Sequence, residues 1–174
     1  DPGASIVYGQ KTKNKEELQE MINQDKWDDI YKKYPVADGD FVYLPAGCLH
    51  AMGKGNVVYE IQQSTDVTYR FYDYHRKDKD GNERELHLKQ AIDCLSFDKD
   101  IDKNDVHPVV KVHENMKETI FISNDSFTVS QLLVIGKCQY KCDNYQLATV
   151  VKGSGKVDEY DVKVGDNFLI PTNT

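Results

Sequence analysis

The chain has 174 residues, of which 39% are apolar and 29% are charged, so it is long and apolar enough to bury a core. Its net charge of −7 argues against a surface that binds nucleic acid or an anionic membrane nonspecifically. A few local Arg or Lys residues can still bind a small phosphate ligand. No apolar run approaches the ~18 residues of a membrane span, so we expect neither a span nor a signal sequence.

The first part of the chain predicts one strand and two helices. Residues 4–10 have the composition of a strand. Residues 14–24 predict a helix that Asn14 caps and whose Glu17 completes a capping box. Residues 26–35 predict a second, short helix, because their aromatic and apolar side chains share one face before a proline.

The central part predicts mainly strands. Residues 40–45, 56–63 and 67–74 are rich in Val, Tyr and Phe, which favours three strands. The polar residues 75–85 predict a loop, and residues 86–95 a short helix. Many charges and few apolar residues make the following segment, 96–106, a predicted linker.

The last part predicts short strands with turns between them, which indicates a sandwich or a barrel. These strands are expected within "ETIFISND", "FTVSQLLVIG", "YQLATVVKG" and "NFLIP". An internal repeat links this part to the first, since "ADGDFVYLPAG" (37–47) resembles "KVGDNFLIPTN" (163–173). Each copy has a Gly-Asp turn, an apolar strand and a terminating proline. The repeat predicts two domains of one kind.

The cysteines indicate a reducing environment. No pair has CxxC spacing, which argues against a structural zinc knuckle and favours a reduced, cytoplasmic protein. The four are Cys48, Cys94, Cys138 and Cys142.

One histidine stands in an unusual context, the stretch "YLPAGCLHAMGKG" (43–55), where His50 follows a Pro-Ala-Gly turn. A single histidine is a weak metal signal, because a metal site needs three or four converging ligands. An ordinary hydrogen-bonded histidine therefore remains an open interpretation. No other histidine offers HxH, HxxxH or HxxE spacing.

The surrounding motif resembles a known family. The spacing of Gly39, Pro45, Gly47 and His50 resembles a metal-binding motif of the cupin double-stranded β-helix, although Lys54 stands where that motif has an asparagine. A longer stretch, including "EIQQSTDVTYR" and "YDYHR", resembles the short bacterial form of the type I mannose-6-phosphate isomerases. The resemblance covers residues 1–95 well and the second half more loosely.

The resemblance implies a mostly β fold with two cupin-type (jelly-roll) domains. Residues 1–95 would be part of a metal-binding catalytic domain with a helical insertion at 14–34. Residues 107–174 would be a second, truncated cupin-like domain. Because the chain starts without Met and stops in a predicted strand, we expect it to be a piece of a longer protein. Its partner would be the missing N-terminal part.

The resemblance also assigns roles to residues. His50 would bind a zinc ion, one per active site, whose other ligands lie before the first residue. Arg70 would be catalytic and Glu60 would bind substrate. In a strand, Arg70 would share a face with Thr68 and Tyr72. Without the resemblance, an Arg like Arg70 is more often a surface salt-bridge residue and a Glu like Glu60 more often an outward strand position.

The implied activity is a metal-dependent aldose–ketose isomerisation. It would interconvert mannose-6-phosphate and fructose-6-phosphate through an enediolate, with a sugar phosphate as substrate. Two alternatives remain: a non-catalytic cupin that binds a sugar or metabolite, and a different cupin enzyme such as a dioxygenase. A dioxygenase requires a multi-histidine site, and the chain offers one well-placed histidine.

Overall fold

A computed structural model describes residues 1–97 and 106–172, which are mostly β with few helices. Most of the predicted linker, together with Asn173 of the repeat, lies outside the described residues. The chain forms two compact units, Asp1–Val110 with Thr119–Gln131 and Lys111–Glu118 with Leu132–Thr174. The elements in chain order are β1 (Ser5–Gln10), α1 (Lys15–Asn23), α2 (Trp27–Ile30), β2 (Tyr31–Pro35), β3 (His50–Met52), α3 (Leu88–Cys94), β4 (Val109–His113), β5 (Met116–Ser123), β6 (Thr128–Val134), β7 (Gln146–Thr149), β8 (Ser154–Val157), β9 (Tyr160–Lys163) and β10 (Asn167–Ile170).

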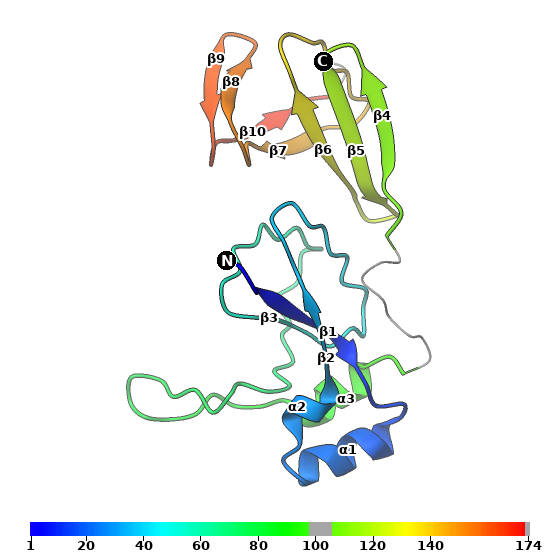
Figure 1. The fold of residues 1–174 in the computed structure, drawn as a ribbon, viewed down its shortest axis with the longest axis vertical. Helices are drawn as coiled ribbons and strands as arrows, with labels where there is room; N and C mark the ends of the chain where they lie inside the picture. Colours follow the sequence, from blue (N-terminus) through cyan, green and yellow to red (C-terminus); the bar gives the residue numbers. More distant parts are fainter. Residues whose placement is uncertain (98–105, 173–174) are drawn as a thin grey trace. The chain divides into compact units, whose positions relative to one another are not determined.

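The first unit is organised around an antiparallel sheet of order β2-β1-β3 (Figure 1). The predicted strand at 4–10 is confirmed as its central strand, β1. Alternate β1 side chains face two different clusters, as the strand period requires. Val7 enters a cluster that we call the helix-side core; the helices contribute Leu18, Ile30, Ala91 and Ile92 to it. Ile6 and Tyr8 enter a second cluster with Cys48.

Helix α1 begins where the sequence predicts. The Asn14 side-chain oxygen accepts the Glu17 backbone N–H at 2.8 Å, so the predicted cap is confirmed. The Glu17 carboxylate accepts the Lys13 backbone N–H at 2.7 Å and not that of Asn14, so the predicted capping box is displaced by one residue. Leu18 is fully buried, so this capped helix docks on the sheet through its apolar face.

The second predicted helix is wrong beyond Ile30. Helix α2 ends there, and Tyr31–Pro35 forms strand β2 against β1, with Ser5 opposite Pro35 and Val7 opposite Lys33. Tyr31 is buried, Lys32 and Tyr34 are half-buried, and Lys33 and Pro35 are exposed, a pattern that suits a strand as well as a helix. The strand is favoured over the helix because residues 31–35 pair with β1 and satisfy the backbone hydrogen-bonding groups along one edge of β1.

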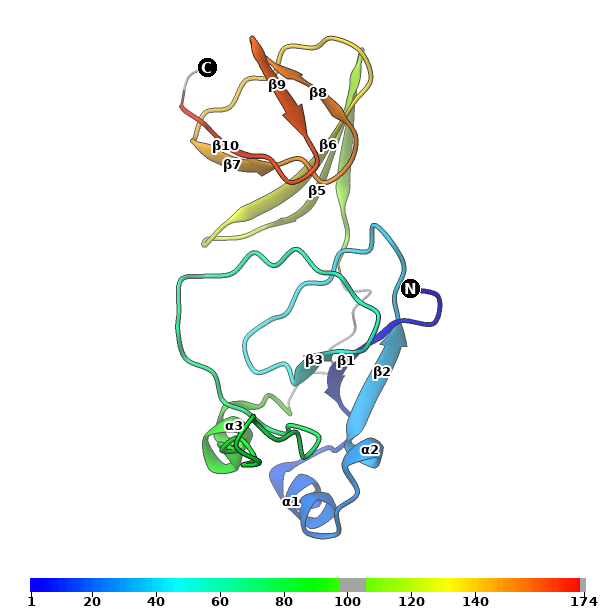
Figure 2. The ribbon, with the colours of Figure 1, turned by 90° about the vertical axis from the view of Figure 1, so that its left-hand side faces the viewer.

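The predicted strands at 40–45, 56–63 and 67–74 are not formed as strands. Figure 2 shows the segment between β3 and α3 running without strand arrows. Among the described residues, residues 60–69 make no backbone–backbone hydrogen bond. Apolar side chains are exposed along this segment, including Val57, Val58, Ile61 and Val67. The segment has a strand's composition, but in the described residues no strand pairs with it.

The internal repeat forms the same turn twice. In the first copy, Asp40 accepts the Ala37 N–H at 3.0 Å; in the second, Asp166 accepts the Lys163 N–H at 2.8 Å. Gly39 has φ +87° and the equivalent glycine of the second copy has φ +93°, a conformation that glycine adopts without a steric penalty. The second copy continues into β10, which pairs antiparallel with β7. The first copy has no such ladder in the described residues.

The strands predicted in the last part are formed as β5, β6, β7 and β10. Three further strands, β4, β8 and β9, were not predicted; β4 joins the sheet β4-β5-β6 and the other two form an antiparallel hairpin. Of the described residues after 105, only Met116 and Cys142 are buried, so these strands enclose little core. None of the helices in the described part of the chain has the length and apolarity to cross a membrane.

Candidate functional site

His50 is the first residue of β3 and lies opposite Tyr8 of β1. Its Nδ1 lies 3.0 Å from the Cys48 carbonyl oxygen. Because a carbonyl oxygen only accepts, this bond puts the imidazole proton on Nδ1 and leaves the Nε2 lone pair available. The side chain is exposed, so Nε2 is accessible. This is the arrangement of many metal-binding histidines, whose second nitrogen is held by a carbonyl.

Two glycines fix the backbone on either side of His50. Gly47 has φ +81°, and a Cβ there would lie 3.0 Å from both the Cys94 carbonyl oxygen and the Ser96 backbone nitrogen. A Cβ on Gly53 would lie 2.3 Å from the Ser5 carbonyl oxygen. A side chain fits at neither position without a backbone shift, so the glycines set the course of the chain through β3.

The neighbouring Cys48 is not a ligand in this arrangement. It is buried, and burial raises the pKa of its thiol to about 11. A thiol must be deprotonated to bind a metal ion. Cys48 therefore contributes to the second cluster as a small apolar side chain, and its backbone carbonyl contributes to the site through His50.

Glu60 lies on the open segment after β3 and is exposed. Within the described part of the chain it makes no hydrogen bond or ion pair, and none joins it to His50 or Arg70. In the described residues, no hydrogen bond or ion pair joins any two of the three predicted site residues.

Arg70 is half-buried and held at both its backbone and its side chain. Its N–H donates to His87 Nδ1 at 3.1 Å, and its carbonyl accepts the His87 N–H at 2.8 Å. Its Nη1 donates to the Glu85 carbonyl at 3.0 Å. Phe71 is buried in the helix-side core and Tyr72 packs against the same core. The predicted strand alternation therefore does not hold here, because residues 67–74 do not form a strand.

An ion-pair cluster around one buried carboxylate, near Arg70, was not predicted from the sequence, and its two arginines are exposed. Asp73 is 5% exposed and accepts bonds from the guanidinium groups of Arg84 and Arg76. The Arg84 hydrogen bond above all, and then Arg76, hold the pKa of the Asp73 carboxyl well below its usual range. The available signal was the position of Asp73 two residues after the apolar Phe71, since a carboxylate that is buried beside apolar residues needs a cationic partner.

A strained turn follows Asp73. The Arg76 N–H donates to the Asp73 carbonyl at 3.0 Å across Tyr74 and His75, which have φ +53° and +52°. Two central residues with positive φ are typical of a type I′ turn, in which glycine and asparagine are preferred. The His75 ring lies edge-on against Tyr72, with 5.7 Å between ring centroids.

We predict that His75→Val is less stable than His75→Gly by about 1–2 kcal/mol, because a β-branched residue is strongly disfavoured at positive φ. Both changes delete the imidazole and its contacts, so their difference isolates the backbone term. Urea unfolding of the two variants measures it. Equal unfolding free energies would contradict the strained turn.

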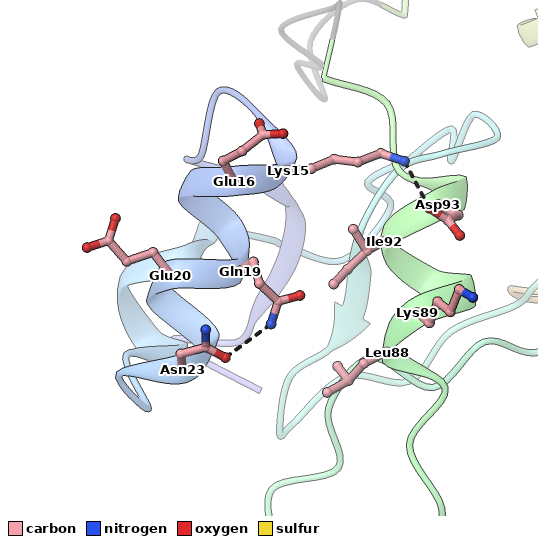
Figure 3. A pocket seen from close by; sticks show the side chains of 9 residues that line it. All are labelled: Lys15, Glu16, Gln19, Glu20, Asn23, Leu88, Lys89, Ile92 and Asp93. Carbon is pink, nitrogen blue, oxygen red and sulfur yellow. Dashed lines mark hydrogen bonds and ion pairs between the residues drawn. The ribbon is translucent and has the colours of Figure 1, made fainter.

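A surface groove of about 750 Å³ lies between α1 and α3. Figure 3 shows Leu88 and Ile92 on α3 facing α1, and the ion pair between Lys15 and Asp93 across the groove. None of the predicted site residues lines it. Its charges have both signs, and it offers no distinct ligand chemistry.

Within residues 1–97 and 106–172, no three His, Cys, Asp or Glu side chains converge as a metal site requires. A metal site that includes His50 therefore needs at least one ligand from outside the described residues. Its donor chemistry still fits a divalent ion, since an accessible neutral imidazole nitrogen is a common ligand of such ions.

Comparison with known proteins relates the chain to one enzyme. It is 38% identical over 176 residues to mannose-6-phosphate isomerase of Streptococcus mutans, covering 98% of this chain and 55% of that protein. A Bacillus subtilis mannose-6-phosphate isomerase is 37% identical, with 97% and 54% covered. The crystal structure of mannose-6-phosphate isomerase from Bacillus subtilis matches with a TM-score of 0.89 at 31% identity, covering 98% of this chain and 55% of that one. No protein-family profile matches. The chain spans about half the length of these relatives.

Proposed function

Because the chain is homologous to mannose-6-phosphate isomerases along almost its whole length, we propose that the protein carrying it interconverts mannose-6-phosphate and fructose-6-phosphate. The observation that carries the proposal is the match to the Bacillus subtilis enzyme, which extends over 98% of the chain in three dimensions. The free cysteines fit the reducing cytoplasm, to which we assign the protein.

His50 is the proposed metal ligand of this chain, through its Nε2. The support is local: Nδ1 is engaged by the Cys48 carbonyl, and Nε2 is accessible. A divalent ion such as zinc would polarise the carbonyl and hydroxyl oxygens of the substrate as a Lewis acid. The fit of His50 does not by itself select zinc among divalent ions.

Arg70 is the proposed catalytic residue. Its guanidinium donates to one carbonyl, and a guanidinium has five N–H donors, so most of them are available to a substrate. A permanently protonated fork of donors suits the negative charge that develops on the oxygens of an enediolate. Glu60, exposed on its segment, is proposed to bind a substrate hydroxyl.

We also propose that polypeptide outside this chain completes the site. The relatives are almost twice as long as the chain. Residues 60–69 make no backbone–backbone hydrogen bond among the described residues, and apolar side chains of this segment are exposed. A neighbouring strand would satisfy these backbone groups, cover the apolar side chains and give Glu60 a fixed position. The same polypeptide is the proposed source of the remaining metal ligands.

The proposal is tested by a coupled assay for fructose-6-phosphate formation from mannose-6-phosphate with the intact protein. We expect turnover that a chelator abolishes and that added zinc or another divalent ion restores. A heat-treated sample and the coupling enzymes with chelator alone serve as controls. Absence of turnover, or turnover that a chelator leaves intact, would contradict the proposed metal-dependent isomerase.

A further inference from the structure

Arg70 is joined to a residue far along the chain by a reciprocal contact. The His87 imidazole accepts the Arg70 N–H through Nδ1 at 3.1 Å, while the His87 N–H donates to the Arg70 carbonyl at 2.8 Å. The segments around them run side by side in opposite directions, since Asp73 meets Arg84 and Lys77 bridges to Glu83. Residues 70–87 therefore form a closed arm with Arg70 and His87 at its base.

The base of this arm is fixed to the helix-side core. The His87 carbonyl accepts the Ala91 N–H at 2.8 Å in the first turn of α3. Ala91 and Ile92 of that helix are buried in the same cluster as Phe71, the residue after Arg70. Both partners thus stand on one rigid support, which is what a precisely held side chain requires.

From these contacts we infer that His87 is a positioning residue for Arg70. The inference rests on the proposed function, in which Arg70 acts on the substrate. The imidazole fulfils the role as a hydrogen-bond acceptor, so its proton is on Nε2 and Nδ1 takes the Arg70 N–H. Together with the Glu85 carbonyl, which accepts from Nη1, His87 fixes the Arg70 backbone and the direction of its side chain.

The matched variants are His87→Leu and His87→Asn in the intact protein. Leucine removes the acceptor, while the asparagine carbonyl oxygen stands close to the position of Nδ1 and restores one. We expect His87→Leu to lower kcat on the order of tenfold with little change in KM, because a lost hydrogen bond displaces a group that acts in the transition state. We expect His87→Asn to recover most of that loss.

Two further measurements separate positioning from folding and from the function itself. His113→Leu removes an exposed imidazole of β4 and is expected to keep the wild-type kcat. Hydrogen–deuterium exchange of the Arg70 amide is expected to rise on the order of tenfold in His87→Leu, because that N–H loses its acceptor. This readout does not depend on activity.

The outcomes are distinct. Wild-type kcat in His87→Leu, equal loss in both His87 variants, or unchanged exchange of the Arg70 amide would overturn the inference. If the wild-type protein does not isomerise mannose-6-phosphate, the proposed function fails, and the exchange of the Arg70 amide alone still decides whether His87 holds Arg70.

Discussion

Replacing Arg70 with alanine is expected to lower kcat by about two to three orders of magnitude while the metal content stays at the wild-type level. The guanidinium is proposed to stabilise charge on the substrate, and it is not a metal ligand. The Arg70 guanidinium is held by hydrogen bonds next to the buried core. In the alanine variant, water molecules are not held at the positions of its N–H donors.

His50→Ala provides the opposing variant. Removing the proposed Nε2 ligand is expected to lower both the bound metal and kcat. Elemental analysis of the purified intact protein and steady-state kinetics measure the two quantities together. Lys79→Ala, at the exposed tip of the 70–87 arm, is the control and is expected to match the wild type. Equal metal loss in the Arg70 and His50 variants would contradict this division of roles.

The second large effect is on stability, where Leu18→Ala is expected to cost about 2–5 kcal/mol of unfolding free energy. Leu18 is 0% exposed and joins α1 to the helix-side core. That cluster also contains Leu49 and Phe71, the chain neighbours of His50 and Arg70. Truncation of Leu18 is therefore expected to loosen the packing of Leu49 and Phe71, and with it the positions of His50 and Arg70.

Denaturant unfolding of Leu18→Ala measures this cost. Gln19→Ala, one position along on the exposed face of α1, is the matched control and is expected to change stability by no more than about 0.5 kcal/mol. Similar unfolding free energies for the two variants would show that the helix-side core does not depend on α1.

Elements with local causes were predictable. Helix α1 follows from the Asn14 cap and a one-sided apolar pattern, and the two Gly-Asp turns follow from an aspartate that accepts a nearby N–H. Strand β1 follows from a short apolar run between turn residues. In each case the deciding contacts lie within a few residues of one another in the sequence.

Elements that depend on distant partners were not predictable in the same way. Tyr31–Pro35 is a strand because β1 offers it an edge, although its pattern also suits a helix. The strand-like segment 56–69 forms no strand because no described strand pairs with it. Asp73 was passed over because its two arginine partners become visible only when the 70–87 arm closes.

The sequence by itself gave the resemblance to mannose-6-phosphate isomerases, the expectation of a mostly β fold and the three residues proposed for the site. It did so because motif spacing and side-chain type are local properties of the chain. Only the tertiary structure decided which nitrogen of His50 is available and which partner holds Arg70. These depend on a carbonyl and an imidazole whose positions are set by folding, since hydrogen bonds require distances and directions that no spacing in the sequence specifies.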